Sequence, residues 1–250
     1  MDSKLDIDIN FDFRSDTPSG KDPDVRSPTL RRYHRQLWSK PLPNGVLFEL
    51  AATTSRVYLH HKSDAGEFVL ASDSVIPTFT RAARSAHIVR EVAVEDCNEF
   101  DRLSYTIGGM MIFPGNKVDG RMTINGARGC HHLIKDRFDL TVECIRRHYS
   151  NQRSPLSDTL TRYDRYFELF VDFRGYVEFF LLQDLVSDDC SMVRFFTPFE
   201  EFRPWPLPNS VTEYHSYRRE AEAFLQARNQ RILEDARAQR TNPTSRIPPV

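Results

Sequence analysis

The stretch from Tyr105 to Tyr149 carries more structural information than any other part of this chain. It reads YTIGGMMIFPGNK at 105–117, TINGARG at 123–129 and DRFDLTVECIRRHY at 136–149. The first two segments are apolar and strand-like, and each ends in glycine and asparagine, which favour turns. The third segment carries charges of both signs at helical spacing. The stretch therefore predicts two strands, each followed by a turn, and then a charged helix.

Composition allows one large or two small domains, and no boundary signal divides the chain, so a single domain is expected over residues 1–240 with a Pro-rich, disordered tail over 241–250. The chain has 250 residues, 40% hydrophobic and 12% aromatic, which is enough for a sizeable core. Its net charge of −1 gives no overall attraction to nucleic acid or to an anionic membrane. No apolar run approaches the length of a membrane span. A nucleic-acid partner would therefore need a local basic patch, and a membrane partner is not expected.

Cysteine usage and the first residues predict a cytoplasmic protein. The four cysteines form no CxxC pair and no evenly spaced framework, which favours reduced thiols: Cys97, Cys130, Cys144 and Cys190. The start, MDSKLDIDINFDF, is acidic and lacks the basic and apolar regions of a signal peptide.

Strand signals dominate the first half of the chain. Apolar and polar residues alternate strictly over residues 5–13, which predicts a half-buried strand. Ser27-Pro28 predicts a capped helix with a stripe of apolar side chains, which is followed by strands at 46–50, 57–61 and 67–71. A helix is expected to begin near Ser74.

Helix signals dominate the second half. Leu156, Leu160, Tyr163 and Phe167 are spaced to share one face of a helix over 155–170. Residues 176–186 are apolar nearly all round and predict a core helix, and residues 192–196 read as a strand. Ser210 and Glu213 form a capping-box pattern that opens a long C-terminal helix. Strands early and helices late together predict an α+β fold rather than alternating βαβ units.

Four segments, at 27–45, 105–129, 136–149 and 172–186, resemble an uncharacterised family of bacterial proteins, a domain of unknown function. The similarity extends from about Phe11 to Ile232. It implies a bacterial origin and a single full-length domain. No activity or catalytic residue is assigned to the family, so the resemblance implies no chemistry.

Several kinds of site are not supported by the sequence. His60-His61 and His131-His132 are adjacent pairs rather than the i, i+4 pairs that chelate a metal from a helix. The chain contains no GxSxG, GxGxxG or GxxxxGK[ST] motif. No metal and no cofactor are therefore predicted.

A polar cluster around Arg128 remains the candidate site. Asn125 and Arg128 lie in the predicted second turn, where glycines let backbone approach a ligand and arginine offers a forked donor for carboxylate or phosphate. Glu143 and Arg147 on the next helix complete the set, although their i, i+4 spacing also fits a plain ion pair. Turn chemistry and surface ion pairs are the alternative interpretation of the whole cluster.

Two functions remain open on this basis. The first is a protein that binds a partner or a small polyanionic ligand through the Arg128 turn. The second is an enzyme acting on a nucleotide or nucleic acid, with Arg128 and Arg147 as clamps and Glu143 or Asp139 as acid or base. The surrounding strands should fold without this arginine, so Arg128→Ala should change stability by no more than about 0.5 kcal/mol, as for a surface substitution.

Overall fold

The computed structural model describes residues 7–52, 59–64, 66–80 and 85–241. The α-helices in this part of the chain are α1 (Pro23–Arg26), α2 (Pro28–Trp38), α3 (Ala86–Val89), α4 (Val94–Ser104), α5 (Ile124–Cys130), α6 (Phe138–Tyr149), α7 (Ser157–Thr161), α8 (Asp164–Phe167), α9 (Phe173–Phe179) and α10 (Val211–Thr241). Three 3-10 helices accompany them: η1 (Ile107–Gly109), η2 (Glu168–Phe170) and η3 (Gln183–Leu185). The strands are β1 (Lys40–Pro41), β2 (Leu47–Phe48), β3 (Ala51–Ala52), β4 (Leu59–Ser63), β5 (Gly66–Ser74) and β6 (Met110–Pro114).

The main sheet is antiparallel with the order β3-β4-β5-β6, and β1 and β2 form a separate two-stranded ribbon. Strand β5 is longer than β4, which pairs with it only up to Leu70. From Leu70 to Ser74, β5 pairs with β6 on its other side. Among the described residues no second strand pairs with β5 at 72–74, where Ser72 and Ser74 bond to side chains of His34 and Asp24 instead.

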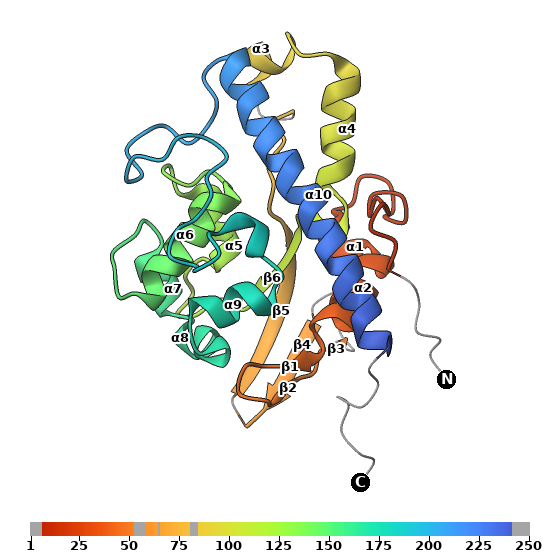
Figure 1. Ribbon diagram of the computed structural model, residues 1–250, viewed down its shortest axis with the longest axis vertical. Coiled ribbons are helices and arrows are strands. Elements are labelled where there is room, and N and C mark those ends of the chain that lie inside the picture. The colour runs from red at the N-terminus through yellow and green to blue at the C-terminus, as the bar shows by residue number, and fades with distance from the viewer. Residues whose placement is uncertain (1–6, 53–58, 65, 81–84, 242–250) are drawn as a thin grey trace.

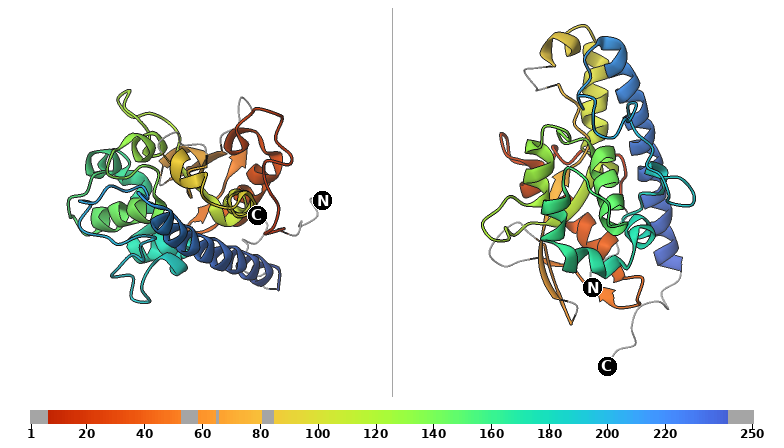
Figure 2. Two further views of the ribbon diagram at one scale, coloured as in Figure 1. Left: turned by 90° about the horizontal axis from the view of Figure 1, so that it is seen from above. Right: turned by 90° about the vertical axis from the view of Figure 1, so that its left-hand side faces the viewer.

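Helices cover the sheet from two sides (Figures 1 and 2). Helices α5 to α9 lie together on one side of the strands, whereas α1 and α2 lie on the other. The long helix α10 runs beside α4 and contacts η1 and η3. Strands in the first half and helices in the second confirm the predicted α+β class.

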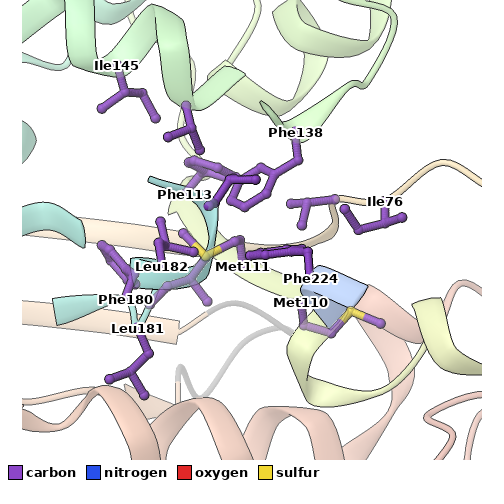
Figure 3. Close-up of a cluster of buried hydrophobic side chains, with 14 of the residues drawn as sticks. Ile76, Met110, Met111, Phe113, Phe138, Ile145, Phe180, Leu181, Leu182 and Phe224 are labelled. Atoms are coloured by element: carbon purple, nitrogen blue, oxygen red, sulfur yellow. The ribbon is translucent and has the colours of Figure 1, made fainter. Parts of the chain in front are cut away.

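The centre of the core lies where β6, α6, the segment after α9 and α10 meet (Figure 3). Met110 to Phe113 of β6 are fully buried, which is the pattern of a strand covered on both faces. Phe138 and Phe224 approach this strand from α6 and α10. The buried hydrophobic side chains form one cluster across the described residues.

Two buried polar residues fasten α10 to this core. The guanidinium of Arg228 donates to the carbonyl oxygens of Gly108, Met110 and Phe180 at 2.8, 3.0 and 3.1 Å. Asn229 accepts from the amide of Gly108 at 2.7 Å. These bonds satisfy backbone groups of η1 and β6 that would otherwise be buried without partners.

Helix α2 follows the sequence pattern closely. The side chain of Ser27 accepts from the amide of Leu30, and Pro28 occupies the first helical turn. The apolar stripe is buried: Leu30, Tyr33, His34, Leu37 and Trp38. Trp38 Nε1 donates to His34 Nδ1, so neutral His34 donates from Nε2 to the Ser72 hydroxyl at 3.0 Å. Burial lowers the pKa of His34 to about 3, which keeps the ring neutral and joins α2 to β5.

Two strand predictions were wrong because side chains cap turns there. Leu5 and Asp6 lie outside the described residues, and residues 7–13 form turns in place of the expected strand. The carboxylates of Asp8 and Asp12 accept from backbone amides two residues later, which stabilises the turns. The expected second central strand is helix α5, whose first turn is capped by Thr123 through the amide of Gly126.

The other corrections concern helix ends and continuity. The helix expected near Ser74 is absent from the described residues up to 80, because β5 continues to Ser74 and residues 75–80 have no regular structure. The predicted helix over 155–170 is divided into α7, α8 and η2, although all four predicted side chains are buried. At the interruption, the Tyr163 hydroxyl donates to the carbonyl of Asn116. Residues 176–186 are helical only in part, and residues 192–196 contribute a single bridge at Val193.

Candidate functional site

Arg128 does not lie in an exposed turn. It sits on α5 with a side chain that is 0% exposed. Nη1 donates to the carboxylate of Asp73 at 2.5 Å, and Nη2 donates to the carbonyls of Val75 and Asp136 at 3.1 and 2.5 Å. Nε donates to the Thr141 hydroxyl at 3.3 Å. With these four partners the guanidinium is fully engaged within the protein, and it joins α5 to β5, to the residue that follows β5 and to α6.

The remaining predicted site residues do not converge on Arg128. Asn125 points its amide towards β5, where Nδ2 lies 3.5 Å from the carbonyl oxygen of Ser72. Glu143 pairs with both Arg146 and Arg147 at 2.8 and 2.7 Å, so the plain i, i+4 ion pair is confirmed. Arg147 also pairs with Glu201 at 2.6 Å.

The other proposed acid or base, Asp139, is equally engaged. It is buried against Arg137 and also accepts from the amide of Phe196. Glu143 and Asp139 are therefore held in ion pairs along α6.

A cavity of about 310 Å³ lies directly beside Arg128. Segments distant in sequence form its walls, namely residues 77–80, α4, the loop after α5 and Leu207. Its lining residues are Pro77, Thr78, Phe79, Thr80, Asp101, Tyr105, Gly129, Lys135, Asp136 and Leu207. This size lies at the lower end for small-molecule sites, which combine an apolar surface with a few polar groups.

Lys135 and Asp136 form the wall next to Arg128. Both residues have left-handed backbone, with φ of 47° and 63°, which is unfavourable for residues other than glycine. Arg128 holds this pair from two directions, because its carbonyl accepts from the Asp136 amide at 3.1 Å while its guanidinium donates to the Asp136 carbonyl. Lys135 forms no ion pair with any described residue. Arg128 therefore positions a free ammonium group and a carboxylate at the cavity.

The structure gives a reason for the glycine at position 129 in the GARG segment. A Cβ at this position would lie 3.1 and 3.2 Å from the carboxylate oxygens of Asp136. The missing side chain leaves room for that carboxylate between α5 and the cavity. Asp136 also lies near Arg128, with 3.4 Å between Oδ1 and Nη1.

The opposite wall combines hydroxyl groups, a carboxylate and an aromatic ring. Thr80 donates to both carboxylate oxygens of Asp101, at 3.0 and 3.2 Å, and its hydroxyl lies 3.1 Å from that of Thr78. Phe79 has φ of 62° and packs on Tyr217 at 5.1 Å between ring centroids. Three lining residues thus have left-handed backbone, out of ten non-glycine residues with positive φ in the described chain.

Two carboxyl groups behind the cavity have raised pKa values. Burial raises the pKa of Asp73 to about 6, although the charge of Arg128 acts in the opposite direction. Burial and the neighbouring Asp73 raise the pKa of Asp24 to about 7. Asp24 accepts from the Ser72 hydroxyl at 3.2 Å and from the Ser74 amide at 3.1 Å. Two titratable carboxyl groups, one on α1 and one on β5, therefore lie close enough to influence each other.

Within the described part of the chain, no group of three or more His, Cys, Asp and Glu side chains is arranged to hold a metal ion. His60 and His61 point to opposite faces of β4, as expected for neighbours on a strand, and bond to Glu67 and the Glu49 carbonyl respectively. Among the same residues no helix is long and apolar enough to cross a membrane.

The sequence did not indicate the cavity, because its walls come from four separate segments. Lys135, Asp136, Thr80 and Asp101 belong to no motif and to no periodic pattern. One signal was available in the glycine at position 129, which marks a close approach to the chain.

Comparison with known proteins identifies the family alone. No curated protein and no solved structure matches the chain. The model of a family of unknown function, DUF6994, matches residues 7–232, and the chain therefore belongs to this family.

Proposed function

We propose that this protein binds a small polar molecule in the cavity beside Arg128. The observation that carries the proposal is that two successive residues, Lys135 and Asp136, line the cavity in left-handed backbone conformations. The guanidinium of Arg128 stabilises this backbone by donating to the carbonyl of Asp136. Left-handed conformations at two successive non-glycine residues cost stability, and they persist where surrounding contacts enforce them. Here they present two charged side chains to one concave space.

The charged side chains that line the cavity indicate which chemical groups a ligand would carry. Lys135 offers an ammonium group without an ion-pair partner in the described residues, which suits a carboxylate or a single phosphate. Asp101 and Asp136 offer carboxylate oxygens, which suit an amine or hydroxyl donor. Phe79 and Leu207 supply apolar surface. The expected ligand therefore carries one acidic group together with amine or hydroxyl groups, as an amino acid or a hydroxy acid does.

This proposal changes the role expected of Arg128. A polyanion at Arg128 would meet a guanidinium whose donors are already hydrogen-bonded, and the nearby carboxylates of Asp73 and Asp136 would repel it. Arg128 is instead the residue that positions Lys135 and Asp136. The proposal keeps the binding function expected from the sequence and assigns the ligand contacts to residues other than Arg128.

The test is a thermal-shift screen of the purified protein against amino acids, hydroxy acids and sugar acids, followed by calorimetric titration of the best ligand. Lys135→Met should weaken binding at least about tenfold, the usual range for a hydrogen bond to a charged group. Lys117→Met removes an exposed lysine outside the cavity and serves as the matched control. Equal affinities of both variants, or the failure of every compound class to shift the melting temperature, would contradict the proposal.

An enzymatic role is the second candidate, and one observation favours it. Asp73, with a raised pKa, is bonded to Arg128 directly behind the cavity, and such perturbed carboxyl groups are enriched at catalytic sites. The test is turnover of esters and phosphoesters, including nucleotides, by the wild-type protein and by Asp73→Asn. Turnover that disappears in the variant supports catalysis, and turnover that is unchanged excludes Asp73.

We further infer a bacterial protein of the cytoplasm. The resemblance of the four segments supports the origin. The compartment is supported by the four cysteines, all of which are free.

A further inference from the structure

A second concave site lies on α1 and α2. It is a hollow of about 240 Å³ lined by Arg26, Pro28, Arg31, Arg32 and Arg35. The last four have the spacing i, i+3, i+4 and i+7, so they form the outer face of α2. Arg26 is the final residue of α1 and completes the ring. Four guanidinium groups therefore surround one small space in a chain whose net charge is −1.

None of these four arginines forms an ion pair with a described residue. Arg35 donates through Nε to the carbonyl of Leu50 at 3.3 Å, and Arg32 lies over the ring of Tyr33 at 5.6 Å. The Nε of Arg31 is buried without a hydrogen-bond partner. Such a donor is costly to leave unsatisfied, and here it belongs to a residue that lines the hollow.

The carboxylates nearest in sequence accept hydrogen bonds elsewhere, and Asp22 accepts from the amide of Asp24 at 3.0 Å as the N-cap of α1. Asp16 accepts from the Ser27 hydroxyl and the Thr29 amide, at 2.6 and 3.0 Å. Asp24 accepts from Ser72 and Ser74 of β5. Burial and the charge of Arg26 both lower the pKa of Arg31, as expected for cations held close together. An anion of more than one charge would relieve this repulsion and satisfy the free donors.

We infer that the hollow between α1 and α2 binds the phosphate groups of a small phosphorylated ligand. Arginine is the side chain best suited to bidentate contact with phosphate oxygens. The hollow holds a diphosphate-sized group, whereas a nucleic-acid strand would require an extended basic track. This site is independent of the cavity beside Arg128, because the two share no lining residue.

The test is calorimetric titration with inorganic pyrophosphate at low ionic strength, without divalent cations. Arg31→Gln should weaken binding at least about tenfold, and Arg31→Lys should also weaken it, since lysine lacks the planar fork. The exposed arginine in Arg121→Gln is the matched control and should bind like wild type. Arg32→Gln, which changes an exposed part of the same ring, provides a second variant if Arg31→Gln folds poorly.

Three results would overturn the inference. The first is that pyrophosphate does not bind the wild-type protein at about 10 mM, which corresponds to negligible affinity. The second is that Arg121→Gln weakens binding as much as the ring variants do. The third is that a single-stranded oligonucleotide binds through the same arginines more tightly than pyrophosphate, which would make the hollow part of a nucleic-acid surface.

Discussion

Arg128→Ala should destabilise the protein severely. The substitution leaves the carboxylate of Asp73 without its partner and removes the donor for the carbonyls of Val75 and Asp136. Breaking a buried ion pair by removing one partner costs about 3–5 kcal/mol. An orphaned buried carbonyl adds about 1–3 kcal/mol, without full additivity. We therefore expect a loss of at least about 4 kcal/mol, a large part of the roughly 5–15 kcal/mol that stabilises a folded domain.

Urea denaturation followed by circular dichroism and by tryptophan fluorescence measures this loss. For a chain of this length, 4 kcal/mol corresponds to a decrease in melting temperature of about 8–16 °C. Arg121→Ala, an exposed arginine, should stay within about 0.5 kcal/mol of wild type. Arg128→Lys should fall between them, because lysine can pair with Asp73 and cannot reach all the other partners. A loss below about 1 kcal/mol in Arg128→Ala would refute the structural role assigned to this residue.

Three other predictions concern buried or strained groups. Asp24 has a folded-state pKa of about 7, above its unfolded value, so its ionisation lowers the free energy of unfolding as pH rises from 4 to 7. Between pH 5 and 8 the wild-type protein should therefore lose about 2–3 kcal/mol more stability than Asp24→Asn does in urea titrations. The same pH dependence in both proteins would contradict this. Lys135→Gly relieves a left-handed conformation and should raise stability by up to about 1 kcal/mol while weakening ligand binding, whereas a loss of stability would argue against strain. Arg228→Met leaves three buried carbonyls without a donor and should lower the free energy of unfolding by at least about 3 kcal/mol in thermal unfolding. Arg231→Met removes only a partly exposed ion pair and should lower it by less than about 1 kcal/mol. Equal losses in the two variants would refute this difference.

Local chemistry explains which elements could be predicted from the sequence. Helix α2 was predictable because its cap, its proline and its apolar stripe all lie within twelve residues and agree with one another. The buried faces of 155–170 were predictable for the same reason, since apolar spacing reports burial even where the helix is interrupted. In contrast, TINGARG contains two glycines, which favour a turn by composition. The cap from Thr123 and packing against β6 make it a helix instead.

The site was harder to predict because its contacts are long-range. Its partners Asp73 and Val75, at the end of β5 and just after it, lie 55 and 53 residues away, so the burial of Arg128 left no local trace in the sequence. Glycines beside an arginine looked like an exposed turn that approaches a ligand. In the structure Gly129 instead makes room for the carboxylate of Asp136, and the arginine supports the loop that carries it. The expected exposed turn around Arg128 was thus wrong, because the side chain is buried and bonded to Asp73 and to the carbonyl of Asp136.

The most direct test of the central claim is a crystal structure of the protein with the tightest ligand from the thermal-shift screen. The account predicts ordered ligand density in the cavity beside Arg128, with an acidic group within hydrogen-bond distance of Lys135 Nζ and a donor facing Asp101 or Asp136. Arg128 should keep its bonds to β5 and to the loop in the same crystal. A ligand bound elsewhere while the cavity contains only water would contradict the assignment of this site.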